Sequence, residues 1–221
     1  KAPINIKKSI YLLPELNDKD LSKYQIIACP GCYPTSILLP LKPLIKKKMI
    51  NFSNIVIDSK SGYSGAGRGV HKKYYKKNLN ESLSAYGLNN HRHNPEIEKE
   101  LNKSANKKIY FDFTPHLTPM FRGILTTIYV DIKKNMNKDK VFKYLKNYYK
   151  QHPFIKITKD SFLSTNDVIN TNFCNISVCN SKNKNKLIIL SSIDNLIKGG
   201  SGQAIQNMNK KFNFPAKMGL I

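Results

Sequence analysis

One cysteine stands at a position suited to nucleophilic chemistry. Cys32 follows Cys29-Pro30-Gly31, after a short apolar stretch typical of a buried strand at 24–28, and precedes a largely apolar helical stretch from about Thr35 to Lys48. Unpaired backbone amides and the helix dipole at such a strand–turn–helix junction stabilise a thiolate, so we expect a lowered thiol pKa. A small buried residue without a chemical role is the alternative.

Cys32 is also the second cysteine of a C-x-x-C motif. Cys29 and Cys32 could form a redox dithiol, or half of a zinc site completed by Cys174 and Cys179. The Cys174/Cys179 spacing is loose and falls in a predicted strand, so no metal site is expected. Whether Cys29 forms a reversible disulfide with Cys32 stays open at this point.

Two histidines flank an arginine at a predicted helix entrance. His91-Arg92-His93 directly precedes Asn94-Pro95-Glu96, which offers a polar cap, an early proline and an acid in the first turn. Imidazoles at this place suit proton transfer, the arginine suits anion binding, and Glu96 could orient one imidazole. A solvated basic turn is the alternative.

The segment from Ser61 to Arg68 is rich in glycine and hydroxyl groups. Its backbone N–H groups have little steric cover, as in phosphate-binding loops. The segment matches neither the P-loop pattern nor G-x-G-x-x-G, so by itself it indicates a phosphate site only weakly.

Lysine supplies nearly all of the positive charge. The formal net charge is +23, and of 37 basic residues only Arg68, Arg92 and Arg122 are arginine. All three lie inside motifs, as expected where a rigid bidentate fork must bind a carboxylate or phosphate. The charge raises a basic nucleic-acid-binding protein as a rival function, but lysines scattered among asparagines favour a solvated surface.

Composition favours a cytoplasmic protein with no membrane partner. The longest apolar run is far below the roughly 20 residues of a membrane span, and no signal-peptide pattern is present. Four cysteines are too few for a disulfide framework, so reduced thiols are expected. The sequence begins with Lys1 and not with methionine, and its first predicted element lacks a beginning. We therefore expect an N-terminal part to be missing.

Strand and helix candidates mix without strict alternation, which predicts an α+β fold. Pro34 suits the first turn of its helix, whereas Pro40 and Pro43 are expected to bend or interrupt it. Turns are expected at 114–123 and a Gly-rich loop at 59–68. The remaining strand candidates are 55–58, 109–113, 124–132, 154–157, 175–179 and 187–193, and the remaining helices begin at Pro95 or span 138–150 and 199–209.

Five motifs, in order along the chain, resemble the N-acetyl-gamma-glutamyl-phosphate reductase family of arginine biosynthesis. Cys29 departs from the family pattern, which typically has asparagine there. The motifs are Pro30–Thr35, Asp58–Gly62 with Ser64–Arg68, His91–His93 with Pro95–Ile97, Phe113–Leu117 with Arg122–Gly123, and Asp194–Leu196 with Gly202–Ala204 and Gln206–Asn209.

The resemblance implies a mixed α/β catalytic domain like that of glyceraldehyde-3-phosphate dehydrogenase, with the remaining edge and C-terminal helix of a Rossmann NADP domain. It divides the chain into residues 1–31, the end of an incomplete nucleotide domain; 32–193, the catalytic and oligomerisation domain; and 194–221, a helix returning to the nucleotide domain. The glycine-rich βαβ unit of the family is absent, and a homo-oligomer is expected.

The resemblance also implies NADPH-dependent reduction of N-acetyl-L-glutamyl 5-phosphate, a small acyl phosphate, to N-acetyl-L-glutamate 5-semialdehyde through a cysteine thioester. Alternatives are an inactive fragment, a related semialdehyde dehydrogenase or the nucleic-acid-binding protein above. The implied catalytic residues are Cys32, His93 and His91; the substrate-binding residues are Arg92, Arg122, Lys60 and Glu96; and the NADP(H)-binding residues are Ser61, Gly62, Ser64, Gly65, Ala66, Gly67 and Asn195.

Overall fold

The computed structural model describes residues 3–66 and 81–220. Gly67 and Arg68, which belong to the predicted glycine-rich loop, lie outside these ranges. A seven-stranded sheet of order β4-β5-β3-β6-β9-β8-β7 forms the larger part of the described chain. Its strands are β3 (Ile55–Gly62), β4 (Ser84–Ala85), β5 (Phe111–Thr118), β6 (Ile124–Asp131), β7 (Ile155–Thr158), β8 (Cys174–Asn180) and β9 (Lys186–Ile193).

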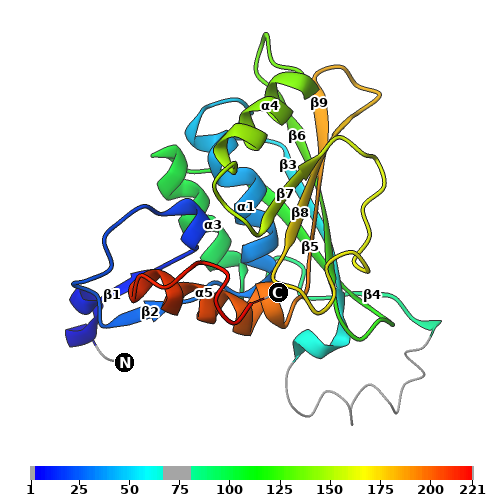
Figure 1. Cartoon of the computed structure of the whole chain (residues 1–221). Helices are drawn as coiled ribbons and strands as arrows, with labels where there is room; N and C mark the ends of the chain where they lie inside the picture. Colours follow the sequence, from blue (N-terminus) through cyan, green and yellow to red (C-terminus); the bar gives the residue numbers. More distant parts are fainter. Residues whose placement is uncertain (1–2, 67–80, 221) are drawn as a thin grey trace.

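Helices cover one face of this sheet. Figure 1 shows α1 (Cys32–Lys46), α3 (Asn94–Ala105) and α4 (Lys138–Tyr148) on the same side of the strands. In β3, Ile55 and Ile57 are buried on this side while Val56 is exposed, the period of two expected of a sheet with one covered face. Among the described residues no helix lies on the opposite face.

A second, two-stranded parallel sheet joins β1 (Ser9–Tyr11) and β2 (Ile26–Ala28). In Figure 1 it lies beside α5 (Gly202–Lys211), away from the large sheet. The strand predicted at 24–28 is therefore confirmed in part, but its expected burial is wrong. Ile26 is 45% exposed because β2 pairs with a single strand among the described residues.

Helix α1 differs from its prediction at its start and in its middle. It begins at Cys32, so Pro34 is its third residue, and it continues through Pro40 and Pro43 without a break. Proline removes the amide that would bond to the carbonyl four residues earlier. For Pro43 that carbonyl belongs to Leu39, and the buried Tyr149 hydroxyl of α4's C-terminal cap donates to it instead, at 2.5 Å. Tertiary packing thus satisfies the polar group that the proline leaves unpaired.

Two strands are longer than predicted. β3 continues through Ser59–Gly62, where a loop was expected, and β5 continues through Thr114–Thr118, where turns were expected. These segments are polar, so their composition suggests turns. They pair with each other in parallel register, Ser59 opposite Pro115 and Ser61 opposite Leu117, and each buries one face under the helices. The other predicted strands and helices are confirmed to within a few residues.

Candidate active site

Cys32 is the first residue of α1. Hydrogen bonds through Glu96 link the preceding residue, Gly31, to α3 and β1. The Glu96 carboxylate in α3 accepts a hydrogen bond from the Gly31 amide at 3.0 Å and another from the Tyr11 hydroxyl of β1 at 2.7 Å. Glu96 therefore orients the peptide that precedes Cys32. No hydrogen bond joins it to a described histidine, so its predicted role in orienting an imidazole is wrong.

Two glycines allow close approaches around Cys32. A Cβ atom on Gly31 would stand 2.4 Å from Nε2 of His93, so this imidazole lies directly against the Gly31 backbone. A Cβ atom on Gly199 would stand 2.6 Å from the Cβ of Cys32. Both distances are far below van der Waals contact, so any larger residue would push the imidazole or the thiol from its place. The structure thus brings Cys32 and His93 together, with only Gly31 between them.

The local environment favours the neutral forms of both groups. Burial raises the pKa of the Cys32 thiol, and this outweighs the lowering by the amides of Tyr33 and Cys32 and by the Arg92 guanidinium. The predicted lowering of the thiol pKa is therefore wrong. Burial, followed by His91 and Arg92, lowers the pKa of His93 to about 4. At neutral pH the pair is a thiol beside an imidazole able to accept its proton.

The lowered pKa of His93 predicts a pH-dependent stability. The unfolded chain binds the proton below pH 6.5 and the folded chain only near pH 4, so stability is full above 6.5 and falls as the pH drops toward 4. The loss from this residue is about 3 kcal/mol at about 1.4 kcal/mol per unit. We expect His93→Asn to reduce the dependence in urea unfolding between pH 7 and 4; an unchanged slope would contradict the assignment.

His91 packs against His93. Its Nδ1 accepts a hydrogen bond from the His93 backbone amide at 3.2 Å, and burial, followed by Arg92, lowers its pKa. The ring of Tyr33 packs edge-on against both imidazoles, with centroid distances of 5.3 Å to His91 and 6.0 Å to His93. Tyr33 was not among the residues predicted for the site. An aromatic residue directly after the nucleophile in a buried helix was the available signal.

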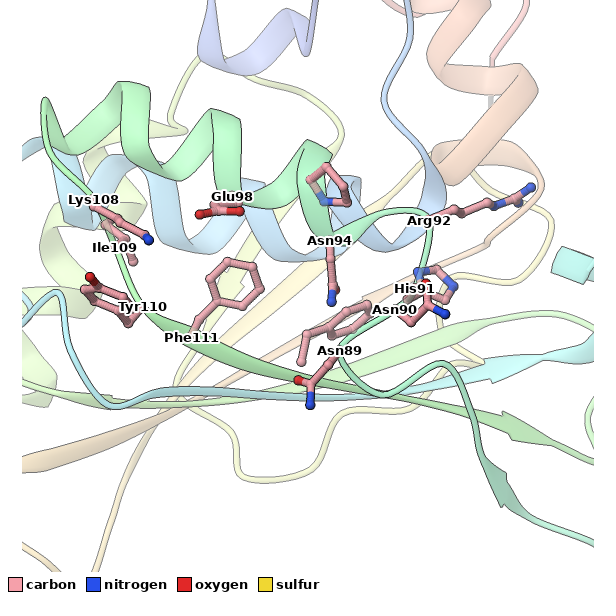
Figure 2. Close-up of a pocket in the computed structure, with 12 residues that line it drawn as sticks. Asn89, Asn90, His91, Arg92, Asn94, Glu98, Lys108, Ile109, Tyr110 and Phe111 are labelled. Carbon is pink, nitrogen blue, oxygen red and sulfur yellow. The ribbon is translucent and has the colours of Figure 1, made fainter.

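Arg92 is exposed, and its guanidinium is close enough to lower the pKa of Cys32. It also borders a pocket of about 480 Å³ between the start of α3 and the start of β5. Figure 2 shows the Arg92 side chain pointing away from Asn89 and Phe111. Cys32 does not line this pocket. Arg92 is therefore available to an anion beside the thiol.

A second polar cluster surrounds the fully buried Asp194. Its carboxylate pairs with Arg122 (Nη1 to Oδ2 3.3 Å) and accepts the backbone amides of Asn170 at 2.8 Å, Leu196 at 2.8 Å and Ile197 at 3.0 Å. The side chain of Arg122 is 30% exposed. Arg122 thus has a structural partner on one side and solvent on the other, so it can still contact an anion. Its neighbour Asp194 was not selected from the sequence.

Asn195 and the segment after β3 are tied to the turn before β6. The Asn195 amide accepts from the Gly123 backbone at 2.8 Å and donates to the Ser64 hydroxyl at 3.0 Å. The amides of Gly62 and Ser64 donate to the carbonyls of Gly123 and Phe121, and that of Tyr63 to Met120. These donors are already used within the chain, so they do not fit the predicted phosphate cradle.

The other predicted cofactor residues differ in their burial and in their contacts. Ser61 is buried on β3 and its hydroxyl donates to the Gly62 carbonyl at 3.0 Å. Gly65 borders the Asn195 amide, where an added Cβ would stand 3.2 Å from Nδ2. Ala66 ends the short 3-10 helix Tyr63–Ala66, and Gly67 lies outside the described residues. The described part of the predicted segment is thus a packed support and not an open loop.

Lys60 lies away from the Cys32 cluster. On β3 the side chains of Ser59 and Ser61 face the helices, so Lys60 faces the uncovered side of the sheet. There its ammonium pairs with Asp58 at 2.5 Å, and His116 contacts the same carboxylate at 3.2 Å. The structure does not bring Lys60 to the predicted substrate site.

The C-x-x-C motif is extended. Gly31 has φ −66° and ψ 165°, and no turn forms at residues 29–31, contrary to the predicted turn. Cys29 and Cys32 are both free, so no disulfide joins them in this structure. Cys174 and Cys179 are five positions apart on β8, so they face opposite sides of the sheet and cannot together complete a metal site with Cys29 and Cys32.

Comparisons with known proteins identify the family of the chain. Residues 32–195 match the family model described as semialdehyde dehydrogenase, dimerisation domain. The chain is 43% identical over 220 residues to an N-acetyl-gamma-glutamyl-phosphate reductase of Halothermothrix orenii, covering 99% of this chain and 63% of that protein. It is 45% identical to the enzyme of the same name from Caldicellulosiruptor bescii, covering 100% and 64%. The chain thus spans less than two thirds of these relatives.

Solved structures show the same fold at low identity. An aspartate semialdehyde dehydrogenase II from Vibrio cholerae superposes with a TM-score of 0.73 at 16% identity, covering 96% of this chain and 70% of that one. The Francisella tularensis enzyme gives 0.70 at 14%, covering 94% and 72%. The predicted mixed α/β fold of the glyceraldehyde-3-phosphate dehydrogenase type is confirmed. Within the described residues, no helix is long and apolar enough to cross a membrane.

Proposed function

This chain belongs to the semialdehyde dehydrogenase dimerisation-domain family, and on that premise we propose that it is the catalytic part of an NADP-dependent N-acetyl-gamma-glutamyl-phosphate reductase. The proposed reaction converts N-acetyl-L-glutamyl 5-phosphate and a hydride into N-acetyl-L-glutamate 5-semialdehyde and phosphate. Relatives of that name at 43% and 45% identity support the substrate. The observation that carries the proposal is the placement of the His93 imidazole beside Cys32 across Gly31.

The first half of the reaction uses residues of this chain. Cys32 is a neutral thiol at rest, so the neutral imidazole of His93 takes its proton as the sulfur attacks the acyl carbon. A carbon–sulfur bond forms, the bond from carbon to the phosphate oxygen breaks, and the phosphate takes a proton from solvent water and leaves as the dianion. Arg92, exposed beside the thiol, stabilises the departing dianion. The product is a thioester on Cys32.

The second half reduces this thioester to the aldehyde, and NADPH supplies the hydride when it is bound. His93 holds the proton taken from the thiol and returns it to sulfur when the tetrahedral adduct collapses and releases the aldehyde. Because the amides of Gly62, Tyr63 and Ser64 are already bonded, we assign no cofactor phosphate to them. The nucleotide-binding surface is proposed to lie mainly with residues 1–31, 194–221 and the part of the relatives that this chain does not span.

The assembly and location follow from the same family. The matched model is a dimerisation domain, which supports a homo-oligomer formed through residues 32–193. The uncovered face of the large sheet leaves Val56 and Tyr129 each 39% exposed. All four cysteines are free, as expected in a reducing compartment such as the cytoplasm.

The test is an assay of the complete protein, expressed from its whole coding sequence. We expect phosphate-dependent formation of NADPH from NADP and N-acetylglutamate semialdehyde, the reverse of the proposed reaction. Aspartate semialdehyde, the substrate class of the structural relatives, serves as the comparison. Preference for aspartate semialdehyde would assign the chain to a related dehydrogenase. Failure with both compounds in a folded protein would overturn the proposed function.

A further inference from the structure

A fully buried ion pair lies behind the Cys32 site. Lys198 belongs to a π-helical turn, Ile197–Ser201, and pairs with Glu15 of the short 3-10 helix Pro14–Leu16. Neither side chain is exposed to solvent. Gln206 of α5 contacts both partners: its oxygen accepts from Lys198 at 2.8 Å, and its nitrogen donates to Glu15 at 2.7 Å. The Asn172 side chain donates to the same Gln206 oxygen at 3.0 Å.

Stability alone does not account for these charges. Removing an ammonium and a carboxylate from water is costly, and apolar residues of the same volume often stabilise a core as well or better. A buried pair does, however, demand one geometry, because any shift leaves a charge unpaired. These partners come from segments 183 residues apart in the chain. The pair therefore helps to place the segment around Glu15 against the turn that follows β9, together with the hydrogen bonds of Asn207 to Leu12 and of Lys210 to Pro14.

The turn that carries Lys198 also borders the nucleophile. Gly199, the next residue, packs so closely on Cys32 that an added Cβ would stand 2.6 Å from the Cys32 Cβ and 3.0 Å from its Cα. The amide of Gly199 donates to the Asp194 carbonyl at 2.9 Å, and that of Ser201 to the Leu196 carbonyl at 2.8 Å, so Lys198 and Gly199 move as parts of one hydrogen-bonded turn. Movement of Lys198 would therefore move the backbone that encloses the thiol.

We propose that Lys198 is a positioning residue, whose ion pair with Glu15 holds the π-helical turn so that Gly199 lies against Cys32 and restricts the access of water to the thiol. Its effect on turnover rests on the proposed function. Its effect on the thiol itself does not, so the two can be measured apart.

The experiment compares Lys198→Met, the double variant Glu15→Gln/Lys198→Met and the unmodified complete protein. The single change leaves a buried carboxylate without its cation and is expected to lower the Tm. The double variant removes both charges with little change of shape, so it is the variant expected to fold. Alkylation of Cys32 by iodoacetamide is followed across pH by tandem mass spectrometry, whose fragment ions separate Cys32 from Cys29 on the same tryptic peptide.

In the double variant we expect Cys32 to react at least about tenfold faster near pH 7, the change that one unit of thiol pKa produces. We also expect a lower kcat at an unchanged KM for the acyl substrate. Lys42→Met is the matched control: it breaks the ion pair with Glu100 (2.5 Å) between α1 and α3, away from the π-helical turn. It should lower the Tm and leave the Cys32 pH profile unchanged.

An unchanged Cys32 profile in a folded double variant would overturn the positioning role, and so would an equal shift in Lys42→Met. If the complete protein alkylates as expected but lacks reductase activity, the proposed function fails while the positioning role stands.

Discussion

Replacing Cys32 with serine is expected to lower the rate of acyl-phosphate reduction by at least about 10³-fold, the scale of losing a covalent nucleophile. The serine hydroxyl is nearly isosteric, so the contact with Gly199 is retained. It is far less acidic than a thiol, and His93, with a pKa of about 4, is too weak a base to remove its proton. The measurement is steady-state turnover of the complete protein, with the protein's fold checked by its thermal unfolding.

Cys29→Ser is the matched control for this substitution. Cys29 is exposed, lies three residues earlier and accepts a hydrogen bond from Asn207 at 3.2 Å, which a hydroxyl can also accept. We expect this variant to keep most of the wild-type rate. A loss in Cys29→Ser with full activity in Cys32→Ser would show that the nucleophile had been assigned to the wrong cysteine.

His93→Asn is expected to lower turnover by about 10²- to 10⁴-fold, the usual contribution of a positioned acid/base group. Asparagine keeps a polar side chain of similar size against Gly31 but cannot accept the thiol proton. Because the resting pair is neutral, the imidazole acts as a general base during attack, and no thiolate waits beside an imidazolium. We therefore expect the remaining activity of the variant to rise with pH as hydroxide replaces the lost base, measured as kcat/KM.

His91→Asn separates the two histidines. His91 contacts the His93 amide and the Tyr33 ring, but no contact places it against Gly31. Its loss should disturb the orientation of His93 and lower the rate less than His93→Asn does. A larger effect of His91→Asn would transfer the acid/base role to His91.

Long periodic segments could be predicted from the sequence because local patterns determine them. The helix predicted at 138–150 forms as α4 (Lys138–Tyr148), where the Asn137 side chain accepts from the Lys140 amide at 2.9 Å as an N-cap should. The strand predicted at 187–193 forms as β9 because its apolar residues are central to the sheet. Polar segments such as Ser59–Gly62 were misjudged, since only their neighbours in the sheet make them strands.

The predicted site residues likewise divide into those that the structure brings together and those that it does not. Cys32, Arg92 and His93 come together as their motifs indicated, because each stands at the beginning of a helix whose N-terminus the sequence marks. Lys60 does not join them, because alternation along β3 directs it to the uncovered face of the sheet. In the described part of the predicted cradle, the amides of Gly62, Tyr63 and Ser64 are occupied by contacts with residues 120–123.

By itself, then, the sequence determined which residue types could react and, to within a few residues, where the helices that present them begin, since propensity, capping and motif spacing are local properties. The tertiary structure decided the sign of the Cys32 pKa shift, because burial depends on packing by segments such as Gly199 far along the chain. It also decided that Lys198 pairs with Glu15 and is not solvated. The solvation of a side chain, and its pairing with a residue 183 positions away, depend on the folded chain and cannot be predicted from a local pattern.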